Sequence, residues 1–193
     1  MITRLYNWIM DLAARRNALV VLAAVSFAES SVFPIPPDVL VVPMVLARRA
    51  RAWLIAGVCT VASVAGGAAG YAIGFFLFES VGRAIVEFYG YGAAFETFRG
   101  WYNDWGLWIV FVAGVTPLPY KVFTITSGVT GLDFAVFLAG SVLSRGIRFF
   151  AEAALLWWIG EPVRHFVEKN LKWVATGFAV LLIGGFVVLR LLT

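Results

Sequence analysis

Two long apolar runs of this chain are each interrupted near the middle by paired prolines. The prolines are Pro34, Pro36 and Pro37 in residues 17–47, and Pro117 and Pro119 in residues 107–131. Proline removes a backbone donor and clashes with the preceding turn, so a continuous helix through either break is not expected. The first run has 31 residues, which is too long for one comfortable span and too short for two. Both runs are therefore predicted to be helical hairpins that enter the membrane and return to the same side.

Three other apolar segments have the length of a single membrane span, namely residues 53–78, 134–159 and 173–192. A hydrocarbon core of about 30 Å is crossed by about 20 helical residues. Composition agrees, because 62% of the residues are hydrophobic, whereas soluble domains have about 45–50%. The predicted fold is an all-α integral membrane protein with two opposed re-entrant helical hairpins and about three spanning helices.

The remaining segments are expected to lie at the membrane surface. Residues 1–16 mix charged and apolar side chains and predict an amphipathic interfacial helix. Residues 79–106 predict an amphipathic linker between the first span and the second hairpin. Residues 17–160 would form the membrane domain, and residues 173–192 would add a C-terminal transmembrane helix.

Basic residues on both sides of the first hairpin indicate how it is threaded. Arg15 and Arg16 precede it, and Arg48, Arg49 and Arg51 follow it. Lys and Arg favour the cytoplasmic side of a membrane, and both clusters stay there only if the segment turns back. Acidic residues flank the second hairpin, which suits the opposite side.

The two proline breaks also belong to an internal repeat. Residues 34–40 match residues 117–123 at an offset of 83, and each copy precedes one long apolar span. Two hairpins that enter from opposite sides make an inverted-topology repeat, which is the pattern of many secondary transporters.

Several classes of function are disfavoured by what the sequence lacks. Cys59 is the only cysteine and His165 the only histidine, so no disulfide and no His or Cys metal site is expected. The net charge of +4 comes from basic residues beside apolar runs, which argues against nucleic acid as a partner. No nucleotide-binding loop or nucleophile elbow is found, so neither an enzyme nor a cofactor is predicted.

Glu29 and Asp38 are acidic residues inside the first predicted hairpin. A carboxylate at this depth is costly unless it is paired, protonated or hydrated. One interpretation is a pair of proton-binding groups that line a cavity. The alternatives are a structural ion pair for Glu29 and a helix cap for Asp38.

Basic residues in the second half of the chain are candidates to bind an anion. Lys121 begins the returning arm of the second hairpin, where free backbone amides also favour a phosphate, and Thr124 offers a hydroxyl. Alternatively, Lys121 pairs with an acid across the two hairpins. Arg145 and Arg148 share one helix face near the middle of their span, where they are expected to pair with Glu29 or Asp38 or to hold a phosphate. The plainer alternative is a salt bridge from Arg148 to Glu152.

These residues resemble the DedA family, the bacterial branch of proteins with a SNARE-associated or VTT domain, and its YqaA-like subgroup. The resemblance covers roughly residues 20–160 and rests on Phe27-Ala28-Glu29, Pro34 to Asp38, Gly114 to Lys121, Gly128 and Ser144 to Phe150. It implies two opposed re-entrant hairpins and a role in moving lipids between leaflets, with Glu29 and Asp38 as the acidic pair. Lys121 replaces one arginine common in the family, and Val115 stands where another would be.

The sequence therefore predicts a multi-pass protein of the bacterial inner membrane that moves an anionic lipid, such as undecaprenyl phosphate or a phospholipid, between leaflets. Lys121, Arg145, Arg148 and Thr124 would hold the head group, and Glu29 and Asp38 would couple movement to protons. Membrane lipid is the expected partner, and assembly as a homo-oligomer is left open. The alternatives are a small-ion or proton-coupled transporter with indirect effects on lipids, and a membrane assembly factor that transports nothing.

Overall fold

The computed structural model describes residues 17–32, 36–116 and 118–169. In these residues the secondary structure is entirely helical. The interfacial helix expected over residues 1–16 and the span expected over residues 173–192 lie outside the described residues, as do Pro34 and Pro117.

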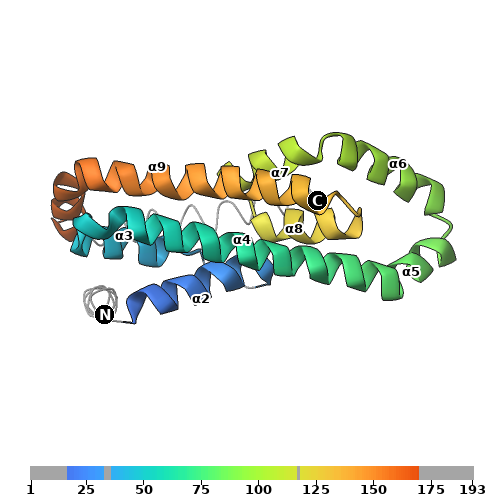
Figure 1. Ribbon diagram of the computed structural model, residues 1–193, viewed down its shortest axis with the longest axis horizontal. Coiled ribbons are helices and arrows are strands. Elements are labelled where there is room, and N and C mark those ends of the chain that lie inside the picture. The colour runs from blue at the N-terminus through green and yellow to red at the C-terminus, as the bar shows by residue number, and fades with distance from the viewer. Residues whose placement is uncertain (1–16, 33–35, 117, 170–193) are drawn as a thin grey trace.

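Two long antiparallel helices form the frame of the molecule (Figure 1), α4 (Ala52–Leu77) and α9 (Phe134–Lys169). Trp53 stacks on Phe150 at one end of the pair, and Tyr71 meets Phe137 at the other. Within the described residues, the helical stretches Arg49–Phe88 and Phe134–Gly160 are long and apolar enough to cross a membrane. They contain the two spans predicted at residues 53–78 and 134–159.

The helix α9 continues beyond the predicted span, through Pro162 to Lys169. The sequence predicted the span to end at residue 159, because apolar residues give way to charged ones after it. Loss of apolarity marks where a helix leaves the hydrocarbon, but it does not by itself break the backbone hydrogen bonds of the helix.

The first proline break separates α2 (Ala18–Ser31) from α3 (Asp38–Ala47). Ser26 contacts Cys59 and Ser30 contacts Ser63, so α2 runs parallel to α4. The helix α3 leads into α4 through the short turn Arg49–Arg51 and runs opposite to α2 (Figure 1). Pro37 precedes α3 with a φ of −65°, a value that suits the start of a helix.

The second break separates α7 (Gly106–Val115) from α8 (Tyr120–Val129). Gly114 lies against Ser144 and Gly140 against Val110, so α7 runs parallel to α9. The helix α8 runs parallel to α4 and therefore opposite to α7 (Figure 1). Thr116 ends α7 with a ψ of 165°, because the residue before a proline avoids helical geometry.

The order of helices repeats at the offset found in the sequence. The returning helix α3 packs on α9 and the returning helix α8 packs on α4, while each first arm lies beside its own long helix. The long helices are antiparallel, so the two units of hairpin and span have opposite directions. This packing brings the ends of the short helices to the middle of α4 and α9.

Between the two units, α4 continues into a π-helical turn (Phe78–Gly82) and α5 (Arg83–Phe88), and α6 (Gly92–Asp104) leads to α7. The linker expected over residues 79–106 is thus helical. Tyr102 fastens α6 to α8, because its hydroxyl contacts the Ser127 hydroxyl and donates to the Phe123 carbonyl.

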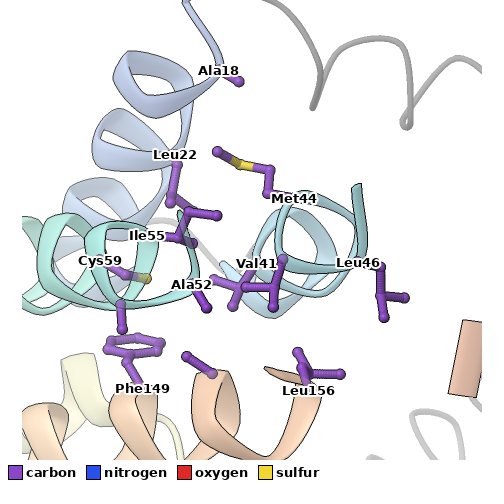
Figure 2. Packing of buried hydrophobic residues seen from close by; sticks show 13 residues of the cluster. Ala18, Leu22, Val41, Met44, Leu46, Ala52, Ile55, Cys59, Phe149 and Leu156 are labelled. Carbon is purple, nitrogen blue, oxygen red and sulfur yellow. The ribbon is translucent and has the colours of Figure 1, made fainter. Parts of the chain in front are cut away.

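The buried apolar residues form two clusters with a polar layer between them. Figure 2 shows the larger cluster, in which Leu22, Val41, Ile55 and Phe149 meet from α2, α3, α4 and α9. The second cluster lies around Phe137, on the other side of the layer along α9. The polar layer consists of the buried residues Ser26, Ser30, Ser63, Thr124, Ser127, Ser141, Ser144 and Arg145.

The outer faces of the long helices are apolar. Val61 on α4 and Leu143, Ile147 and Leu155 on α9 are exposed. Polar side chains inside and large apolar side chains outside are expected when lipid is the surrounding solvent.

We expect a side chain at Gly74 to separate α8 from α4, because its Cβ would overlap the Ile125 carbonyl. Gly74→Val should destabilise the protein by about 1–3 kcal/mol, the usual cost of overpacking. Heating in detergent with a thiol-reactive dye measures this effect, because Cys59 is the only cysteine and is fully buried.

Gly57→Val on the same helix is the matched control, because nothing lies within 4 Å of the Cβ that it would add. Equal melting temperatures for the two variants would contradict the close packing of α4 and α8.

Candidate functional site

An ion pair between Arg145 and Glu29 lies at the centre of the polar layer. Arg145 Nη2 is 3.0 Å from Glu29 Oε2, and the two side chains are 1% and 17% exposed. The pair joins the middle of α9 to α2. The sequence-based expectation that a mid-span arginine pairs with an acid of the first hairpin is confirmed.

The contacts of Arg145 hold its guanidinium in place. Nε donates to Ser63 Oγ at 2.7 Å, and the rings of Tyr120 and Phe149 lie within 5 Å of its Cζ. Ser30 donates to the same Glu29 oxygen and contacts Ser63. Arg145 Nη1 is buried without a hydrogen-bond partner in the described part of the chain. Arg145 is thus fixed in position and still has one donor to offer.

A second ion pair, between Arg148 and Asp38, lies one helical turn away. Arg148 Nη2 is 3.1 Å from Asp38 Oδ2 and 3.3 Å from Oδ1. Arg148 Nη1 donates to the Thr116 carbonyl at the second break. The side chains are 23% and 30% exposed, so this pair is the more accessible one. It connects the two proline breaks through a single cation.

The alternative that Asp38 caps α3 is wrong. Asp38 is the first residue of α3, Pro37 occupies the capping position, and no side-chain capping bond is formed. Asp133 shows what such a cap would look like, since its carboxylate accepts from the amides of Ala135 and Val136 at the start of α9. The Asp38 carboxylate instead faces Arg148.

Lys121 and Thr124 lie on α8, apart from the two ion pairs. Thr124 is fully buried against α4, and its hydroxyl donates to the carbonyls of Ser30 and Lys121. This hydroxyl therefore fastens helices together and does not face a cavity. Lys121 is half-buried, and within the described residues no acid forms an ion pair with it.

Three further features of the site were not identified from the sequence. Tyr120 is fully buried, stacks on Arg145 and donates to Ser141. The contact between Ser30 and Ser63 depends on the register of α2 against α4, which the sequence does not show. Glu152 lies next to Asp38, whereas the sequence predicted at most a bond to Arg148. The sequence signal for Glu152 was its position one helical turn after Arg148.

An apolar groove of about 520 Å³ opens beside the site. Its walls come from α6, α7 and α8, and they consist of Phe98, Trp101, Tyr102, Trp105, Trp108, Ile109, Val112, Ala113, Leu118, Val122, Phe123 and Thr126. None of the described residues that line the groove is charged. Leu118, which lines the groove, lies two residues from Thr116, whose carbonyl accepts from Arg148, so the groove and the second ion pair are close along the chain.

Comparisons with known proteins find a matching family model and similar sequences. A family model described as the VTT domain matches residues 35–158, which include α3 to α8 and most of α9. A protein of Haemophilus influenzae described as uncharacterized is 37% identical over 186 residues, which cover 96% of each chain. An uncharacterized protein of Histophilus somni is 36% identical and covers 96% of this chain and 97% of its own. No solved structure matches the chain.

Proposed function

Because the chain belongs to the DedA, or SNARE-associated, family with a VTT domain, we propose that it is a transporter moving an anionic lipid between membrane leaflets. Membership of this family suggests a transporter-like role in the membrane. The substrate class, an anionic lipid, is inferred from the residues of this chain. The observation that carries the proposal is the Arg148–Asp38 pair, an accessible cation at mid-span held by one carboxylate.

The proposed step is an exchange of partners at Arg148. A lipid phosphate replaces the Asp38 carboxylate on the guanidinium, which binds phosphate and carboxylate oxygens with the same geometry. Arg145 stays on Glu29 and presents its unpartnered Nη1 to the same region. Lys121 at the start of α8 adds a charge and free amides near the break.

The apolar groove supports a lipid over a small soluble anion. Its volume lies within the range of about 300–1,000 Å³ typical of ligand sites, and its lining suits a hydrocarbon chain. The helix α7 is 10 residues long, or about 15 Å, roughly half of a bilayer core. A tail in the groove would thus extend from the interface toward the midplane, as it does in one leaflet.

We further propose that α2–α3 and α7–α8 are re-entrant hairpins that enter from opposite sides of a bacterial inner membrane. The paired breaks would then meet inside the hydrocarbon, and the head group would pass between them while its tails remain in lipid. Proton coupling would reside in the acids of this region. Glu29 is tied to Arg145 and Ser30, so Asp38 is the better candidate of the two expected acids.

The test is leaflet exchange of a labelled anionic phospholipid, and of undecaprenyl phosphate, in liposomes that carry the pure protein. A reductant that does not cross the membrane quenches the label in the outer leaflet, and faster loss of the remainder is the expected result. No acceleration over empty liposomes would remove the proposal. Ion flux without lipid exchange would favour a small-ion transporter, and neither activity would favour an assembly factor.

We expect Val122→Trp to fill part of the groove and slow lipid exchange. Val122 is half exposed and lines the groove, so the larger side chain fits without disturbing the core. Loss of room for two methylene groups would cost about 1.6 kcal/mol, or roughly a tenfold lower rate.

Val142→Trp is the control for this prediction, because Val142 is equally exposed on α9 and does not line the groove. If both variants exchange lipid at the wild-type rate, the tail does not use this groove.

A further inference from the structure

The second ion pair has a third member that none of the steps above uses. Glu152 follows Arg148 by one turn of α9, is half-buried, and lies within hydrogen-bonding reach of Asp38. Asp38 comes from α3 and pairs with Arg148. Two carboxyl groups from different helices therefore face one guanidinium in the middle of the membrane-spanning part.

The charges of this cluster do not balance if every group is ionised. Arg145 and Glu29 neutralise each other, which leaves Arg148 against both Asp38 and Glu152 and a net charge of −1. An uncompensated charge at this depth is costly. Two carboxyl groups in contact avoid the cost by sharing one proton.

Among the described residues, the helices packed on this cluster offer no cation beyond Arg145 and Arg148 to balance the second carboxylate. Neither α3 nor α4 contains a Lys or Arg. The Cys59 thiol on α4 carries no positive charge and contacts the Ser26 hydroxyl. Within the described part of the chain, Lys121 of α8 forms no ion pair with either carboxyl group.

We propose that Asp38 and Glu152 hold one exchangeable proton between them, and that this proton sets how tightly Arg148 binds an anionic phosphate. The proposal rests on the proposed function for the identity of the anion. With the proton bound, Arg148 faces a single negative charge, and a phosphate can replace Asp38. When the proton leaves to water, two carboxylates hold Arg148 and oppose the phosphate.

Linkage makes the effect reciprocal. If the protonated protein binds phosphate more tightly, then bound phosphate favours uptake of the proton by the same factor. The proton comes from water and forms an O–H bond on a carboxyl oxygen, and no electron transfer is involved. Glu152 would then be a coupling residue, whereas Glu29 would be a structural partner of Arg145.

The first measurement is binding of labelled phosphatidylglycerol to the pure full-length protein in detergent across a pH series. This probe is a phosphodiester, so its own charge does not change over the range, unlike that of a phosphate monoester. Wild-type affinity should fall by about tenfold per pH unit above the point where the shared proton is lost. Glu152→Gln mimics the protonated group, so its affinity should stay at the acid level at every pH.

The matched control is Glu87→Gln, which removes an exposed acid on α5 and should keep the wild-type pH profile. A Glu152→Gln profile identical to that of wild type would overturn the proposal. A wild-type affinity that does not change with pH would overturn it as well.

A second measurement is independent of the substrate and of transport. Infrared spectra at neutral pH should contain the carbonyl band of a protonated carboxyl group, lost in both Glu152→Gln and Asp38→Asn and kept in Glu87→Gln. If wild type lacks the band, the proposal of a shared proton is refuted, even if lipid exchange proceeds. If the band is present and is lost in both variants, but liposomes show no lipid exchange, only the proposed function is refuted.

Discussion

Glu29→Ala is expected to destabilise the protein by about 3–5 kcal/mol, the usual effect of breaking a buried ion pair from one side. Arg145 is 1% exposed, and no other acid among the described residues forms an ion pair with it. Its remaining hydrogen bond goes to Ser63, which is neutral. The Cys59 thiol should therefore react at a markedly lower temperature in Glu29→Ala than in wild type, in the same dye assay.

The double variant Glu29→Ala with Arg145→Met separates lost charge balance from lost packing. If the penalty comes from an unpaired guanidinium, removing the guanidinium should recover most of the stability, because apolar residues often replace buried pairs without cost. A double variant less stable than either single variant would mean that the contacts of the two side chains, not their charges, hold α2 to α9.

Most of the helical framework could be predicted from the sequence, because strong local signals determine it. The breaks follow from the prolines, since Pro37 precedes α3 and Thr116 follows α7 in the geometry that proline favours. The spans follow from the length of apolar runs. The end predicted for this helix, at residue 159, was wrong because α9 continues to Lys169. Hydropathy locates the edge of the membrane and not the last hydrogen bond of a helix.

The pairing of charges could be predicted only in part. Spacing on α9 puts Arg145 and Arg148 on one face, but which acid each one reaches depends on the position of α2 along α4 and of α3 along α9. Close approach of Gly66 to the Phe27 backbone sets that depth for α2, and the sequence contains no measure of it. The burial of Thr124 and the contact of Glu152 with Asp38 are likewise products of helix register.

Loss of the Arg148 guanidinium should have the largest effect on transport. We expect Arg148→Ala to slow lipid exchange by about 100-fold, which corresponds to the loss of about 3 kcal/mol from charged hydrogen bonds to the phosphate. The fold should survive, because Arg148 and Asp38 are both partly exposed and water can solvate the carboxylate that the change leaves without its partner. Arg148→Lys should retain part of the rate, because lysine keeps the positive charge but lacks the planar guanidinium that binds two oxygens at once.

Arg148 could instead serve only to join helices, and a double variant distinguishes this structural role from binding of the lipid phosphate. Asp38→Asn combined with Arg148→Ala removes the unpaired carboxylate, so it should restore any packing that the single change disturbs. If Arg148 acts on the lipid, the double variant stays about as slow as Arg148→Ala, because no carboxylate change returns the missing donor. The control is Arg83→Ala on α5, which breaks an exposed ion pair with Glu79 and should leave the rate unchanged. Recovery of fast exchange in the double variant would show that Arg148 only joins α9 to α3, and the phosphate would then have to be sought at Lys121.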